Sequence, residues 1–272
     1  MNAQRQNSPD TESLMQRFER LATMKKRRNA AKADDLLFES YEENDRAAAR
    51  ALLEMASELD PCNVDVWLGL LRFEPLDRRT EIAFLRRFVA MAEEKLGKRA
   101  FREEKGAFWG SLKTRPYMRA RSLLALRLME AGRLEESVAE HEGMLELNPN
   151  DNQGVRYGLM ALYLALSNLE GANRLFREYD ERAHRAMFAW AYVMERCLAG
   201  DTEGAIQALA AARKQNTHAE PYFAGIKRLP RKMPGSYSIG SAEEAAIAWE
   251  ILKPAWKKHP EVQAWLIGQR AK

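Results

Sequence analysis

The sequence predicts an all-α fold, a right-handed superhelical solenoid of about six helical hairpins, from two observations. First, a glycine followed by a short polar stretch and then small residues recurs at Gly132, Gly200 and Gly240. The first two copies lie 68 positions apart, which is two steps of about 34 residues, the period of stacked helix–turn–helix repeats. Second, no stretch of any length alternates polar and apolar residues as a strand would.

Repeats are predicted to start near residues 30, 64, 118, 152, 186 and 220. Each second helix should carry a small residue, a large residue four positions later and a proline about eight positions after that. Three sets fit this pattern in whole or in part, namely Ala49 with Leu53 and Pro61, Ser137 with His141 and Pro149, and Ala205 with Leu209. Three looser sets are Ala245 with Trp249 and Pro260, Ala83 with Arg87, and Gly171 with Leu175.

Each residue of this pattern has a physical role. The small residue lies where the two helices of a hairpin cross, because a larger side chain would push their axes apart. The glycine before the second helix supplies a turn with positive φ. Pro61 and Pro149 end their helices, since proline lacks an amide proton and restricts the residue before it. Ser241 and Glu244 form a capping-box pattern.

The chain is predicted to contain an N-terminal segment, residues 1–29, and a repeat domain, residues 30–272. The segment is polar and is expected to be disordered or partly helical, with Leu14, Phe18 and Leu21 at helical spacing. Two insertions, near 95–116 and 227–240, interrupt the repeats. Phe108 and Trp109 in the first insertion either pack against neighbouring repeats or form an exposed anchor for a partner.

Composition excludes several classes of site. The chain has 272 residues, a net charge of +4 and only two cysteines, Cys62 and Cys197. Two distant cysteines make neither a disulfide framework nor a four-thiolate zinc site, and we expect no metal and no cofactor. The chain has no apolar signal core and no stretch of about 18 apolar residues, so we expect no membrane span and a cytoplasmic setting.

These positions resemble the tetratricopeptide repeat family over most of residues 30–265. Trp67 and Leu70 match its consensus, Met118 to Asp151 forms the best single repeat, and Leu71 departs from a consensus glycine. The phrases at 114–121 and 147–154, and the series Ala245, Trp256 and Trp265, look like a group of mostly uncharacterised bacterial tetratricopeptide proteins. That group is distantly similar to the animal suppression-of-tumorigenicity proteins. The resemblance implies an interaction scaffold rather than an enzyme, and the zinc motif of some bacterial relatives has no match here.

In arrays of this type the first helix of each repeat lines the concave side, roughly with its second, fifth, ninth and twelfth residues. Counting in this way gives a candidate peptide-binding groove of Arg119, Ser122, Gln153, Arg156, Tyr163 and Trp190. The two arginines would bind a carboxylate in bidentate fashion, and the two aromatic rings would hold an apolar side chain. Alternatively, both arginines make structural ion pairs within the array, for instance with Glu130 or Asp151.

A second function class is nucleic-acid binding through basic segments. The candidate cations, with Tyr222, Phe223 and Tyr237 nearby for stacking on bases, are Lys25, Lys26, Arg27, Arg28, Lys227, Arg228, Arg231 and Lys232.

A third class, an enzyme, has little in its favour. The sequence lacks the phosphate-binding loop, zinc-protease and serine-hydrolase motifs. Adjacent carboxylates such as Glu135 and Glu136 diverge on a helix, and Cys197 with His184 would need to meet in space. We therefore expect no catalytic residue and a protein or peptide partner, while the sequence does not indicate the oligomeric state.

Overall fold

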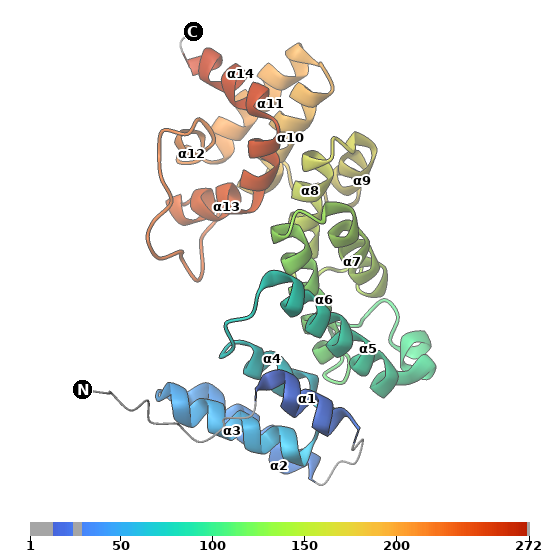
Figure 1. Ribbon diagram of the computed structural model, residues 1–272. Helices are drawn as coiled ribbons and strands as arrows, with labels where there is room; N and C mark the ends of the chain where they lie inside the picture. The colour runs from blue at the N-terminus through green and yellow to red at the C-terminus, as the bar shows by residue number, and fades with distance from the viewer. Residues whose placement is uncertain (1–12, 24–28, 271–272) are drawn as a thin grey trace, which may run out of the picture. The chain divides into compact units, whose positions relative to one another are not determined.

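The computed structural model describes residues 13–23 and 29–270, and this part of the chain contains fourteen helices and no strand (Figure 1). The predicted all-α fold class is therefore confirmed. The chain forms two compact units, an N-terminal unit of Met1–Arg127 and a C-terminal unit of Leu128–Lys272. The basic run Lys25 to Arg28 lies outside the described residues.

The helices of the N-terminal unit pack against their neighbours in the chain. Neighbouring helices pack in sequence order, α2 on α3, α3 on α4 and α4 on α5. The helices are α1 (Leu14–Ala22), α2 (Ala30–Glu42), α3 (Arg46–Leu59), α4 (Val64–Leu71), α5 (Arg78–Glu103) and α6 (Arg115–Glu130), which ends just past the boundary between the units.

The C-terminal unit contains the other eight helices of the described residues. Its helices are α7 (Leu134–Leu147), α8 (Val155–Ala165), α9 (Leu169–Tyr179), α10 (Ala186–Leu198), α11 (Thr202–Gln215), α12 (Glu220–Phe223), α13 (Ala242–Lys258) and α14 (Pro260–Arg270). Among the described residues, no helix has both the length and the apolar character needed to cross a bilayer.

The second helices share a local signal that sets their register. In five of these helices a small residue that is at most 6% exposed lies four positions after the N-cap. Three of the five N-caps directly follow a glycine with positive φ, namely Gly132, Gly200 and Gly240. The N-cap and small-residue pairs are Asp45 with Ala49, Arg133 with Ser137, Asn168 with Ala172, Asp201 with Ala205, and Ser241 with Ala245.

This register corrects two of the looser sequence assignments. In α9 the residue four positions after the N-cap is Ala172 rather than Gly171, so the count from the N-cap is off by one residue, although Gly171 is also buried and packs against Tyr163 of α8. In α5 the predicted pair Ala83 and Arg87 faces solvent, and Ile82 is buried instead. Neither repeat has the closing proline, although the repeat of Ala205 lacks it too and its small residue was predicted correctly.

The segment before residue 30 includes a docked helix. Ser13 and Gln16 form a capping box at the start of α1, with each side chain accepting a backbone N–H from the other residue. The buried ring of Phe18 meets Trp67 edge-on at 4.9 Å and Phe88 at 5.3 Å. These contacts fix α1 on α4 and α5, so the helical spacing noted in the sequence reflects packing within the N-terminal unit.

The first predicted insertion begins as an extension of α5 and continues as a connection without helix up to the start of α6. The helix continues through Lys95, is interrupted at Gly97 where φ is 66°, and ends at Glu103. Phe108, which is 0% exposed, packs on Phe101 and Tyr117 at 5.0 and 6.0 Å between ring centroids. Phe108 is therefore a core residue, in line with the first of the two alternatives. Residues 227–240, the second predicted insertion, form a connection without helix.

The core of the C-terminal unit is centred on aromatic rings from three helices. Trp190 of α10 stacks on Phe223 of α12 at 4.5 Å and 5°, and Trp256 of α13 lies 5.0 Å from Phe223. In addition to its sequence neighbours, α13 packs against α8 and α10. The last long helix thus lies across the first helices of two earlier hairpins.

Gly171→Ala is expected to destabilise the protein although alanine is the better helix former. A Cβ at this position would lie 2.9 Å from three ring atoms of Tyr163, so the ring would have to move. We expect a loss of about 1–3 kcal/mol of unfolding free energy, measured by urea titration. Gly268→Ala in α14, where a Cβ meets nothing within 4 Å, serves as the control and should be neutral or stabilising by up to about 1 kcal/mol. Equal effects of the two substitutions would contradict the close packing described here.

Candidate functional site

The predicted groove residue of the N-terminal unit, Arg119, is already paired. Its Nε and Nη2 donate to the two carboxylate oxygens of Asp65 at 2.7 and 2.5 Å, a bidentate ion pair between α6 and α4. Ser122, one turn further along α6, is exposed and also belongs to the N-terminal unit. The guanidinium fork expected to bind a partner's carboxylate is thus engaged by a carboxylate of the chain itself.

The other groove candidates belong to the C-terminal unit and do not share one open surface. Arg156 donates to Asp151 at 2.7 Å and to Glu181 at 2.8 Å, which agrees with the alternative of structural pairs. The ring of Tyr163 is buried, and its hydroxyl donates to Glu142 and accepts from Arg174. Trp190 is fully buried in the aromatic core, whereas Gln153 is partly exposed.

The one-residue register error accounts for Arg156 and Tyr163 of α8, whereas Trp190 of α10 is buried because Phe223 and Trp256 pack against it. Counting from the corrected register, the inward residues of α8 are Tyr157, Ala161 and Leu164. Tyr157 borders a small space between α8 and α13, and Nε2 of His259, just after α13, lies 3.0 Å from the carbonyl oxygen of Leu164. We call the side formed by the inward residues of the first helices the inner face. In the C-terminal unit α13 covers this face on α8 and α10.

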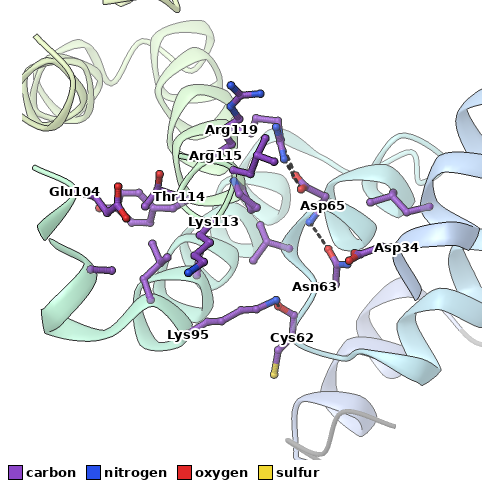
Figure 2. Close-up of a pocket in the computed structure, with 18 of the residues that line it drawn as sticks. Asp34, Cys62, Asn63, Asp65, Lys95, Glu104, Lys113, Thr114, Arg115 and Arg119 are labelled. Carbon is purple, nitrogen blue, oxygen red and sulfur yellow. Dashed lines mark hydrogen bonds and ion pairs between the residues drawn. The ribbon is translucent and has the colours of Figure 1, made fainter. Parts of the chain in front are cut away.

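The inner face of the N-terminal unit, by contrast, contains a cleft of about 960 Å³, here called the N-terminal cleft (Figure 2). It is formed by α2, α4, α5, α6 and the connection between α5 and α6. Counting from residue 30, the fifth, ninth and twelfth residues are Asp34, Phe38 and Tyr41, and all three line the cleft, as do Asp65 and Arg119. The same count applied to the first repeat would therefore have found this site from the sequence.

Large apolar side chains are exposed around the N-terminal cleft. Phe38, Tyr41 and Leu112 are 64%, 56% and 75% exposed. Phe38 and Tyr41 lie one turn apart on α2 with ring centroids 6.4 Å apart. Burying one such side chain is favourable by about 1.5–3 kcal/mol. Contact of this surface with another molecule would therefore be favourable.

Charge is distributed unevenly over the walls of the cleft. The wall from α5 to the start of α6 carries four cations, Lys95, Arg99, Lys113 and Arg115, and two carboxylates, Glu103 and Glu104. The opposite wall carries Asp34 and Asp65. Asp34 accepts a hydrogen bond from Asn63 at 2.8 Å, and Asp65 is neutralised by Arg119. Burial and the nearby Asp65 raise the pKa of Tyr41, which keeps its hydroxyl protonated.

The basic connection between α12 and α13 is a separate surface feature. Lys227, Arg228, Arg231 and Lys232 are all exposed, and Nζ of Lys227 lies 4.7 Å from the ring centroid of Tyr222. Leu229, between these cations, and Met233, directly after them, pack against the core, which holds the cations outward. Of the three aromatic residues considered for stacking on bases, Tyr222 and Phe223 are buried and Tyr237 is exposed.

The environment of Cys197, the cysteine considered as a nucleophile, favours the protonated thiol. Cys197 is partly buried beside Val262 and Trp265, and burial raises the pKa of its thiol to about 12. The thiol is therefore protonated at neutral pH, whereas a reactive cysteine needs a lowered pKa. Within residues 13–23 and 29–270, no group of three or more histidine, cysteine or acidic side chains is arranged to hold a metal ion.

Comparisons with known proteins supply no family for this chain. A scan against protein-family models gives no match, and a search of curated proteins gives none either. The tetratricopeptide resemblance therefore remains a prediction from the sequence, and the candidate site is defined by its geometry.

Glu244→Ala is expected to loosen the cover that α13 forms over α8 and α10. The buried carboxylate accepts backbone N–H groups of Ala186 at 3.0 Å and Gly240 at 2.7 Å, and the side-chain amide of Asn216 at 3.0 Å. Hydrogen bonds to a charged group contribute about 1.5–3 kcal/mol each, and their loss leaves buried donors unpaired. We expect a loss of at least about 3 kcal/mol in urea unfolding followed by tryptophan fluorescence.

The control for this substitution is Glu243→Ala, which removes the neighbouring exposed carboxylate. Its effect should stay below about 1 kcal/mol, the usual contribution of an acidic residue in a first helical turn. If both variants unfold at the same urea concentration, Glu244 does not anchor α13.

Proposed function

We propose that this chain is a tetratricopeptide-like scaffold that binds a segment of a partner protein in the N-terminal cleft and catalyses no reaction itself. The ordered hairpins, the small residue four positions after each of five N-caps, and the glycine turns support the repeat part of the proposal. The open inner face of the N-terminal unit supports the binding part.

One observation carries the binding proposal. The inner face of the C-terminal unit is buried by α13, whereas the inner face of the N-terminal unit leaves Phe38, Tyr41 and Leu112 more than half exposed around a cleft. Exposed apolar side chains are common singly, but a group of them in a concave site is typical of an interaction surface. Apolar anchors in a desolvated pocket also provide most of the affinity in protein interfaces.

Peptides selected by display of a random 16-residue library on the full chain should lose binding to the variant Phe38→Ala/Tyr41→Ala/Leu112→Ser. Removing three anchors should weaken binding at least about 30-fold, because one anchor commonly contributes 1 kcal/mol or more. Fluorescence anisotropy of labelled peptides measures the change.

The matched control is Met55→Ala/Ile206→Ser, which alters exposed apolar residues on α3 and α11 that do not line the cleft. Circular dichroism should show that both variants keep the helical content of the wild type. Peptides that bind the wild type and the anchor variant equally would remove the N-terminal cleft as the binding site.

A second candidate function, nucleic-acid binding, is favoured by the concentration of charge in one segment. Without the four cations at 227–232 the chain has 39 basic and 39 acidic residues. No acidic residue occurs between Glu220 and Glu243. Four exposed cations thus lie in one connection with no carboxylate among them in the sequence, which suits contact with phosphates.

Replacing Lys227, Arg228, Arg231 and Lys232 by alanine tests this candidate. If it is right, single-stranded RNA binds the wild type at low salt and the logarithm of its affinity falls linearly with the logarithm of salt concentration, less steeply in the variant. The control replaces four exposed cations of α5, Arg79, Arg86, Lys98 and Arg102, and should keep the wild-type slope. Negligible RNA affinity of the wild type at low salt would dismiss this candidate.

A further inference from the structure

We infer that the segment bound in the N-terminal cleft is an amphipathic helix with carboxylates along one flank of its apolar stripe. This inference rests on the proposed function and adds the conformation and charge of the partner. Three observations lead to it: the way the C-terminal unit covers its own inner face, the hydrogen-bonding groups of the cleft, and the charges on its walls.

The C-terminal unit shows which kind of segment an inner face of this chain accommodates. The cover is α13, a helix of 17 residues. It buries Ala248, Leu252 and Trp256 on the side that packs against α8 and α10. A helix suits such a face because its backbone groups are paired internally, so contact needs only complementary side chains.

The amide side chain of the N-terminal cleft is not available to pair with the backbone of an extended peptide. An extended chain carries one donor and one acceptor per residue, and these need partners when they are buried. Among the residues that line the cleft, Asn63 is the one amide side chain. Its Nδ2 donates to Asp34 at 2.8 Å and its Oδ1 accepts the backbone N–H of Asp65 at 3.2 Å. An extended segment would have to pair its backbone with the charged and hydroxyl side chains of the walls, whereas a helix leaves those side chains to the partner's own side chains.

The dimensions and apolar groups of the cleft also fit a helix. Its volume of about 960 Å³ is at the upper end of the range for small-molecule pockets. Phe38 and Tyr41 form a ridge along α2, and Leu112 comes from the connection before α6. A helix presenting apolar residues at positions i, i+3, i+4 and i+7 would place them against this ridge.

The charges on the walls of the cleft indicate where the partner helix carries its carboxylates. Figure 2 shows Lys113 and Glu104 on one side of the cleft and Asp34 on the other. On the wall that carries the four cations, Arg99 is paired with Glu103 at 2.7 Å and Lys95 lies 3.6 Å from Asp60. Lys113 and Arg115, with Glu104 nearby, then supply the positive charge that a partner would meet. Carboxylates on the partner helix would face this wall, and complementary charge of this kind speeds association and fixes orientation.

The test uses the displayed peptides that depend on Phe38, Tyr41 and Leu112, each synthesised with a fluorescent label. A proline in the middle of a helix removes one hydrogen bond and clashes with the preceding turn. Central proline substitution should therefore weaken binding at least about tenfold. Circular dichroism of the mixture, after subtraction of the protein and peptide spectra, should show a gain of helix.

The charge component is tested with Arg99→Glu/Lys113→Glu, two exposed residues that line the cleft. Peptides with an acidic flank should bind this variant at least about tenfold more weakly, and analogues with lysine in place of those acids should bind it more tightly. The matched control is Lys98→Glu/Arg102→Glu, which changes exposed cations of the same helix outside the cleft. The control should leave the affinity for both peptides within about twofold.

The outcomes separate this inference from the proposed function. Peptides that need Phe38 and Tyr41 but tolerate central proline would overturn the helical partner and leave the cleft as a binding site. Helical peptides with equal affinity for Arg99→Glu/Lys113→Glu and its control would overturn the acidic flank. If no peptide depends on Phe38, Tyr41 and Leu112, the inference and the proposed function both fail.

Discussion

The packing of α13 across α8 and α10 is the contact on which the C-terminal unit depends. Trp190, Phe223 and Trp256 meet there as one buried aromatic group. Glu244 joins the start of α13 to the start of α10 by accepting the backbone N–H of Ala186. Without α13, the inner face of α8 and α10 would expose Trp190 and Met187 to water, at about 1.5–3 kcal/mol for each side chain. A helix distant in sequence thus completes a core that the earlier hairpins cannot complete alone.

The two units differ because only one of them supplies its own cover. In α13 the buried side carries Ala245, Ala246, Ala248 and Ala255, and these small residues let the helix axes approach closely. In the N-terminal unit the corresponding candidate is the connection between α5 and α6, but Phe108 packs inward there and Leu112 points to solvent. That connection forms one wall of the N-terminal cleft and leaves the ridge of Phe38 and Tyr41 uncovered. The difference in function proposed for the two units follows from this difference in packing.

How much the sequence predicts depends on the range of the interaction. Helix starts near residues 30, 64 and 186 agree with α2, α4 and α10, because caps, glycine turns and small residues act within a few positions. The position of Ala172 could not be separated from Gly171, since both are small and adjacent. The cover of α13 over α8 could not be predicted, because it joins segments about 90 residues apart through ordinary apolar side chains. The cleft could have been predicted by counting the inward positions of the first helix from residue 30.

Arginines and aromatic residues at inward positions differ in what they indicate. An arginine at such a position signals binding only if no carboxylate of the chain reaches it, and Asp65 and Asp151 do reach Arg119 and Arg156. Each ion pair reduces the positive charge that a partner would meet. A ligand that binds the arginine must also break the existing ion pair, which costs free energy. An aromatic ring carries no charge that an ion pair could neutralise. Only contact with other atoms removes its apolar surface from water. Phe38 and Tyr41 have not been buried by their own chain, and for that reason they, rather than the arginines, define the surface that a partner would use.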